Sequence, residues 1–113
     1  MKRLTLSLVA IATLSAVFLA AQSKQTFTGM ITDSECPKGD HSVMQMGSND
    51  AECTIACVEI HGALYLLYDG KDTAYNLSDQ KAPKAFAGKK VAVTGTLDAK
   101  TNTIKVDTIA AAK

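Results

Sequence analysis

Four side chains between Cys36 and Cys57 have the residue types and spacing to bind a metal ion or to form a disulfide. Cys36 is followed by His41 after four intervening residues. Cys53 and Cys57 are separated by three residues, which on a helix places both thiols on one face with Cβ atoms about 5 to 6 Å apart. Three sulfurs and an imidazole suit zinc or copper(I). The spacing therefore predicts a tetrahedral Cys3His site.

Two methionines lie between these pairs and extend the soft donor set. Met44 and Met46 follow His41 closely and carry thioether sulfur. Because thioether and thiolate ligands favour copper(I), both residues are candidate additional ligands if the ion is copper. The sequence does not choose between the two metals.

The same cysteines allow two other interpretations. Cys36 can form a disulfide with Cys53 or Cys57, which would stabilise a loop of about twenty residues by about 3 kcal/mol and leave one thiol over. The pair Cys53 and Cys57 can also act alone in thiol redox chemistry. A structural staple, a copper- or zinc-handling site and a redox pair therefore remain open hypotheses.

The chain lacks three motifs that are typical of common enzyme classes. It has no Ser-His-Asp order typical of hydrolases, no Gly-rich phosphate loop and no H-E-x-x-H motif. Its formal net charge is only +1, and Lys2 and Arg3 supply two of the 12 basic residues against 11 acidic ones. A surface so close to neutral argues against a nucleic-acid partner. The first hypothesis is thus a non-enzymatic module that binds a small ligand or a protein.

The N-terminal segment has the three parts of a signal peptide. Lys2 and Arg3 form a basic start, and residues 4–21 are apolar and uncharged. Small residues then allow cleavage after Ser23 or after Ala21, with the first preferred. We therefore predict a signal peptide over residues 1–23 and export to the periplasm or the medium. The alternative is that the apolar run of 18 residues stays uncleaved as an N-terminal membrane anchor. The mature chain, without stable membrane association, would be a single domain over residues 24–113.

The elements that must hold the cysteines are mostly short strands. Alternating apolar residues and turn signals predict five strands with a helix inserted between the first two and a short helix between the third and fourth. The strands are expected over 26–32, 63–68, 73–77, 91–97 and 103–109, and the short helix over 82–87. This order predicts a mainly β fold, a small five-stranded OB-like barrel. A small sandwich or meander could use the same strands.

The inserted helix has its own start signal. Asn49 followed by Glu52 predicts an N-terminal capping pair, and the helix should run from about Asp50 to Ile60. Its spacing places Ile60 on the same face as the two cysteines, toward the barrel. On the second and third strands, Tyr65 and Tyr75 are candidates for a ligand-binding face, as in OB folds.

Several stretches together resemble a known group of proteins. They are residues 28–36, which end in Glu35-Cys36, then His41, the run Glu52-Cys53-Thr54 with Cys57, and residues 86–97. With these the chain resembles an uncharacterised family of small exported bacterial proteins that carry a domain of unknown function. The resemblance implies a secreted or periplasmic OB-like domain without an assigned chemistry.

Overall fold

The computed structural model describes residues 23–113. The predicted signal peptide, with Lys2, Arg3 and the apolar run, therefore lies outside the described residues except for Ser23. Within the described part of the chain, no helix is long and apolar enough to span a bilayer.

The described chain is mainly β, with one α-helix between the first two strands. This confirms the predicted strand number and the place of the inserted helix. A short 3-10 helix between the third and fourth strands also lies where a helix was expected. In chain order the elements are β1 (Gln25–Asp33), α1 (Asp50–His61), β2 (Tyr65–Tyr68), β3 (Ala74–Leu77), the 3-10 helix η1 (Ala82–Phe86), β4 (Lys90–Asp98) and β5 (Thr103–Ala111).

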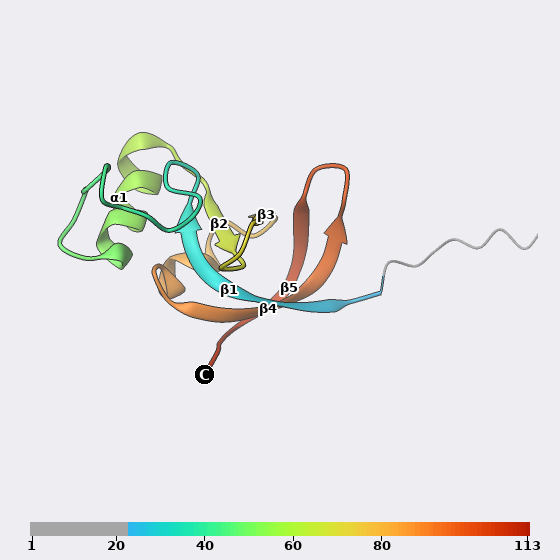
Figure 1. Cartoon of the computed structure of the whole chain (residues 1–113). Coiled ribbons are helices and arrows are strands. Elements are labelled where there is room, and N and C mark those ends of the chain that lie inside the picture. Colours follow the sequence, from blue (N-terminus) through green and yellow to red (C-terminus); the bar gives the residue numbers. More distant parts are fainter. Residues whose placement is uncertain (1–22) are drawn as a thin grey trace, which may run out of the picture.

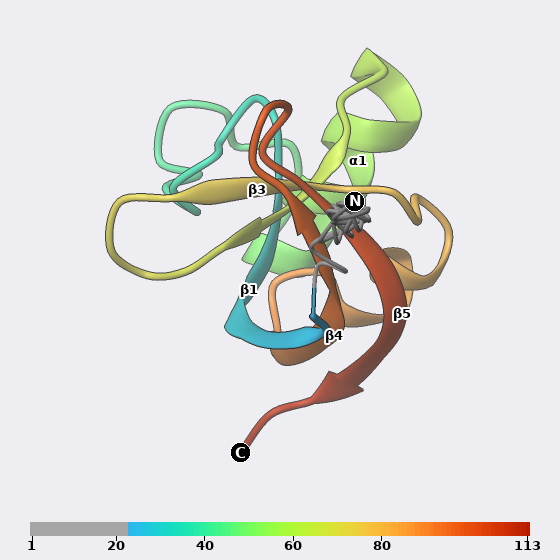
Figure 2. The ribbon, with the colours of Figure 1, turned by 90° about the vertical axis from the view of Figure 1, so that its right-hand side faces the viewer.

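The five strands close into a ring in the order β1-β2-β3-β5-β4, and β4 returns to β1. All neighbours are antiparallel except β3 and β5, which pair in parallel through two residues of each strand. The long β4–β5 hairpin rises at one end of the molecule, and α1 lies at the other end (Figure 1). The view along the molecule shows the strands curving around a common interior (Figure 2). The end that carries α1 is the end that holds the cysteines.

Strand β1 takes part in two pairings, and Gly29 lies where they meet. Its first part pairs with β4, and its last part, Met30 to Asp33, pairs with β2. A Cβ atom at Gly29 would lie 2.2 Å from the carbonyl oxygen of Tyr68. Only glycine therefore lets β1 bend here while β2 approaches so closely.

The interior of the ring is apolar and forms from alternating strand positions. Val91 and Val93 on β4 are fully buried, as their alternation predicts, and the intervening Ala92 is partly exposed. Ile31, Leu67 and Ile104 meet them from three other strands, also without exposure. This core fixes the ends of β1 and β2, from which the candidate site is built.

Helix α1 begins and ends as its sequence predicts. The Asn49 side chain accepts a hydrogen bond from the Glu52 backbone N–H, at 2.9 Å. Gly62, with φ of 71°, ends the helix in the left-handed conformation that glycine adopts most readily. Ala51 and Ile55 pack against the core of the ring. The helix is thereby held at both ends and along one side.

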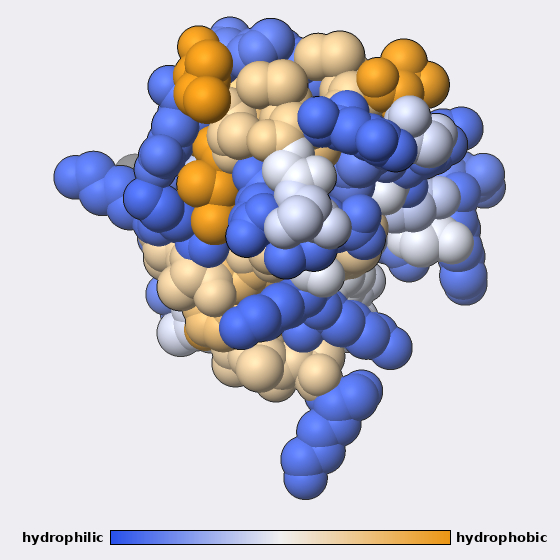
Figure 3. All heavy atoms as spheres, turned by 90° about the vertical axis from the view of Figure 1, so that its left-hand side faces the viewer, coloured by the Kyte–Doolittle hydropathy of each residue, from blue (hydrophilic) through white to orange (hydrophobic). Residues whose placement is uncertain are grey.

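One expectation for α1 is wrong: Ile60 does not face the interior. Its side chain is 71% exposed, although it follows Cys53 and Cys57 on the same helical face. Met46 and Ala63 cover the two cysteines, and this cover does not extend to the last turn of the helix. Viewed from this end, apolar side chains alternate with polar ones on the surface (Figure 3).

Candidate functional site

The candidate site lies between the end of β1 and the first turns of α1. Residues 34–49, which join these elements, contain no helix or strand. They carry Cys36 and His41 over α1, whose inner side carries Cys53 and Cys57. All four side chains are buried, but of these four only Cys36 and His41 belong to the one group of close donor atoms among residues 23–113.

Asp33, the last residue of β1, shapes the start of this segment. Its Oδ1 atom accepts hydrogen bonds from the backbone N–H groups of Glu35 and Cys36, at 2.9 and 3.0 Å. The hydroxyl of Thr32 donates to the Cys36 carbonyl oxygen at 2.7 Å. These three bonds turn the chain sharply after β1 and fix the position of Cys36.

The second carboxylate oxygen of Asp33 faces His41. Asp33 Oδ2 lies 3.9 Å from His41 Nδ1, which is too long for a hydrogen bond. Both atoms are buried, and neither has a hydrogen-bond partner among residues 23–113. Leaving a buried polar group unpaired costs about 1 to 3 kcal/mol. Asp33 Oδ2 and His41 Nδ1 therefore face each other in the interior, each without a hydrogen-bond partner among the described residues.

Cys36 completes a group of three donors. One donor atom each from Asp33, Cys36 and His41 lie within 4.8 Å of one another. Zinc bonds of 2.0 to 2.3 Å place tetrahedral ligands roughly 3.3 to 3.8 Å apart, so closing around an ion would need a contraction of up to about 1.5 Å. Carboxylate, thiolate and imidazole are all zinc ligands. Asp33 was not among the predicted ligands.

The other ring nitrogen of His41 is held by α1. His41 Nε2 lies 3.4 Å from the hydroxyl oxygen of Thr54, which is fully buried. When the ring carries its proton on Nε2, it donates to Thr54 and leaves the Nδ1 lone pair free toward Asp33. Metal-binding histidines are usually oriented by such a second hydrogen bond. The same Thr54–His41–Asp33 order occurs in hydrolases, but here the hydroxyl is inaccessible to a substrate.

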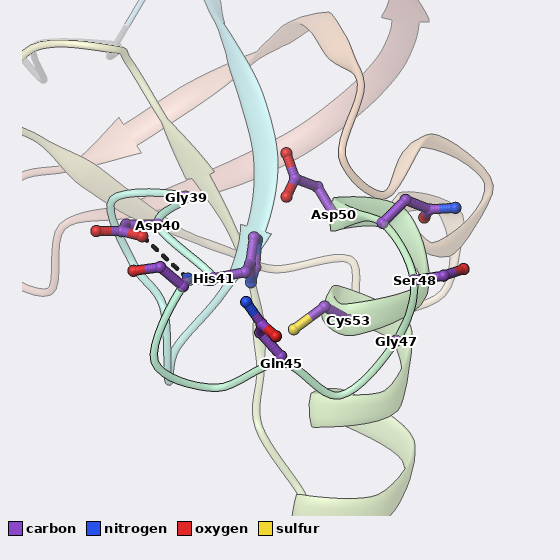
Figure 4. Close-up of a pocket in the computed structure, with 10 residues that line it drawn as sticks. Gly39, Asp40, His41, Gln45, Gly47, Ser48, Asp50 and Cys53 are labelled. Carbon is purple, nitrogen blue, oxygen red and sulfur yellow. Dashed lines mark hydrogen bonds between the residues drawn. The ribbon is translucent and has the colours of Figure 1, made fainter.

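Cys53 is close to this group but already has backbone partners. Its thiol donates to the Met44 carbonyl oxygen at 2.7 Å and accepts from the Met46 N–H at 3.5 Å. Figure 4 shows its sulfur directed from α1 toward the loop that carries His41 and Gln45. A polar pocket of about 480 Å³ opens here. It is lined by Gly39, Asp40, His41, Ser42, Gln45, Gly47, Ser48, Asn49, Asp50 and Cys53.

Burial keeps Cys36 and Cys57 in the thiol form. It raises the pKa of Cys57 to about 12, and the negative charge of Asp33 and the neighbouring Cys53 add to the effect. Burial and Asp33 also raise the pKa of Cys36. All three cysteines are free thiols in the structure. A redox or nucleophilic cysteine needs a lowered pKa, so this environment disfavours the redox hypothesis.

The remaining predicted residues do not join the group of donors. Met46 packs against Cys53 and Cys57 with its apolar side chain, and Met44 reaches Cys53 through its backbone oxygen. Tyr65 is only 2% exposed and belongs to the core, and its hydroxyl has no partner among the described residues. Tyr75 stacks at a tilt against Phe27, with ring centroids 5.3 Å apart. The two tyrosines therefore do not share an open face.

Comparison with known proteins identifies one domain family. A family model described as a protein of unknown function (DUF5818) matches residues 58–112. No curated protein and no solved structure matches the chain. The match agrees with the expected resemblance to an uncharacterised domain family. It begins directly after Cys57 and covers β2 to β5, so the candidate ligands precede the matched region.

Proposed function

We propose that this protein is a non-enzymatic metal-binding module in which Asp33, Cys36 and His41 hold a transition-metal ion. The observation that carries the proposal is the pair of buried, unpartnered atoms Asp33 Oδ2 and His41 Nδ1, with the Cys36 thiol beside them. A cation placed between them would satisfy both at once. It would also convert the Cys36 thiol to a thiolate ligand, because a metal ion displaces the proton of a coordinating thiol.

A simple ion pair accounts less well for this arrangement. A charged histidine and a carboxylate close to about 2.7 to 2.9 Å when nothing separates them. Here the two atoms stay 3.9 Å apart in the interior, and Oδ1 is already engaged by two backbone N–H groups. The gap has the size and the ligands of an ion site.

A fourth ligand is available on α1. Cys53 lines the pocket beside His41, and its thiol forms hydrogen bonds with backbone groups of the neighbouring loop. We propose that its sulfur, or a water molecule in the pocket, completes the shell. Cys57 lies behind it and contacts the apolar Ala63, so it serves packing.

The cellular setting and the finer fold belong to the same proposal. The basic and apolar N-terminal segment supports export to the periplasm or the medium. The closed order of five strands, with helices after the first and third, supports an OB-like barrel. The module would thus handle its ion outside the cytoplasm.

The two histidines of the chain give a matched test. His41→Gln should lower the affinity of the reduced full chain for Zn²⁺ by at least about 100-fold, because a ligand is lost. His61→Gln is the control, since His61 pairs with Glu35 at the surface, at 3.4 Å. Affinity is measured by competition with a chromophoric chelator, and bound metal by native mass spectrometry. Equal affinities of the two variants would refute the proposal.

Native mass spectrometry also distinguishes metal binding from a structural disulfide. A metal-free chain that is lighter by two hydrogens and has one free thiol, when purified without reductant, would indicate a staple. In that case the function would be structural. A chain that carries one ion and three cysteines without a disulfide supports metal handling.

A further inference from the structure

We infer that this site selects a divalent ion of the zinc class over copper(I), and that Asp33 is the residue that makes the selection. The inference rests on the proposed metal-binding function. It concerns the choice of ion, which the cysteines and methionines alone leave open.

The first argument is the hardness of the donors. Asp33 contributes a carboxylate oxygen, a ligand common for zinc but poorly matched to copper(I), which prefers thiolate and thioether sulfur. The two methionines that would favour copper lie elsewhere: Met46 packs against Cys53 and Cys57, and Met44 offers its carbonyl oxygen. The three donors that converge are one oxygen, one nitrogen and one sulfur.

The second argument is charge. Asp33 is fully buried, and Cys36 and His41 are nearly so. A divalent ion bound by one carboxylate, one thiolate, a neutral imidazole and a water molecule gives a site without net charge. A monovalent ion would leave one negative charge uncompensated in the interior, and buried unpaired charge is strongly unfavourable.

The third argument is that the two oxygens of the Asp33 carboxylate have different surroundings. Oδ1 accepts from two backbone N–H groups and is fixed by them. Oδ2 is left free and points at His41 Nδ1. Asp33 can therefore offer one oxygen to an ion without loss of the turn that positions Cys36.

This difference between Oδ1 and Oδ2 allows a variant that removes the ligand atom but keeps the fold. In Asp33→Asn the amide oxygen can still accept from the Glu35 and Cys36 N–H groups. The amide NH2 then replaces Oδ2 and places a donor opposite His41 Nδ1. We expect the metal-free variant to be as resistant to urea as the wild type. Circular dichroism at equilibrium measures this.

The affinities of the full, reduced chain for Zn²⁺ and Cu(I) then test whether Asp33 selects the ion. Asp33→Asn should bind Zn²⁺ at least about 100-fold more weakly than the wild type, as expected for a lost ligand. Its Cu(I) affinity should stay within about twofold, the change typical of a remote surface substitution. Asp98→Asn is the control, because Asp98 is exposed at the end of β4, outside the pocket beside His41, and its carboxylate accepts a hydrogen bond from the Lys100 N–H. Both of its affinities should stay within the same limit.

The possible failures are distinguishable. A wild-type chain that binds neither Zn²⁺ nor Cu(I) would overturn the proposed function. A wild-type chain that binds metal while Asp33→Asn weakens both ions equally, or leaves Zn²⁺ unchanged, would overturn the inference alone. An Asp33→Asn chain that unfolds is replaced by Asp33→Ser, which retains a turn-forming oxygen and lacks the ligand, and the same comparison is made.

Discussion

Single residues at the end of β1 carry both structure and proposed chemistry. Asp33 ends the strand, pairs in register with Tyr65 on β2, and fixes the next turn through one oxygen. Its other oxygen is left unpaired in the interior, at a cost in stability. A buried polar atom without a partner in the protein is commonly explained by a bound water or ion. The neighbouring Tyr65 hydroxyl is also buried without a partner among the described residues.

Tyr65→Phe should therefore cause little or no loss in the free energy of unfolding. Removal of an unpaired buried hydroxyl at constant ring packing should leave the free energy of unfolding unchanged or raise it by up to about 1 kcal/mol. Tyr68→Phe is the comparison, since the Tyr68 hydroxyl donates to the Lys71 carbonyl oxygen at 2.9 Å. Urea unfolding measures both. A loss above about 1 kcal/mol in Tyr65→Phe would mean that the hydroxyl is paired, for example with a buried water.

Residue types predicted part of the site. Cys36 and His41 were predicted as ligands because cysteine and histidine are common metal ligands. Asp33 was not among the predicted ligands, and its Oδ1 atom forms the turn after β1. Its second role depends on which carboxylate oxygen stays unpaired, and that follows from the position of His41 eight residues later, not from local sequence. Tyr65 was placed on a ligand face, but its core position depends on the curvature of the sheet.

At the scale of elements, α1 was predicted nearly to the residue because its signals are local. Asn49 and Glu52 mark its start, and Gly62 marks its end. The exposure of Ile60 could not be predicted in the same way, because it depends on how far a distant segment covers the helix. The loop of residues 34–49 in turn relies on α1, since Met44 and Met46 both bond to Cys53.

Loss of the Asn49 cap should be measurable. Asn49→Ala removes the acceptor for the Glu52 N–H and should lower the free energy of unfolding by about 1 kcal/mol, within a range of 0.5 to 2. Asn49→Asp restores an acceptor and should recover most of the loss. Urea unfolding of the three chains tests this. The capping role is refuted if Asn49→Asp is no more stable than Asn49→Ala.

At the scale of the whole molecule, ring closure brings together strands far apart in the sequence. Alternation predicted which residues of β4 face inward, but not that β1 would pair with both β2 and β4. The parallel contact of β3 with β5 involves only two residues on each strand, too few to leave a pattern in the sequence. Strand number and order along the chain were therefore predictable. Which strands pair with one another was not predictable, because strand pairing depends on long-range packing.

The folded molecule should lose stability in acid. Backbone N–H groups at turns lower the pKa of Asp69 and Asp79, chiefly those of Lys71 and Lys81. A carboxylate whose pKa is lower when folded adds stability above the unfolded value of about 3.9, and this contribution disappears as the pH falls through the folded value. The metal-free chain should thus unfold at lower urea concentration at pH 3 than at pH 6.

A double variant tests the source of this effect. Asp69→Asn with Asp79→Asn keeps the acceptor oxygens but removes both charges. Its urea midpoint should therefore lie below that of the wild type at pH 6, and the difference should shrink at pH 3. If the two chains show parallel pH profiles, other groups cause the acid sensitivity.

The position of the three donors along the chain has a consequence for the order of assembly. Asp33, Cys36 and His41 lie in one short stretch, so an ion held by them closes only a small loop. Closure of the ring instead requires β1 to meet β4 across most of the domain, at a larger entropic cost. Under the proposed function, binding of the ion and completion of the sheet would therefore be separable events. An exported chain would be able to bind its ion before its last strands pair.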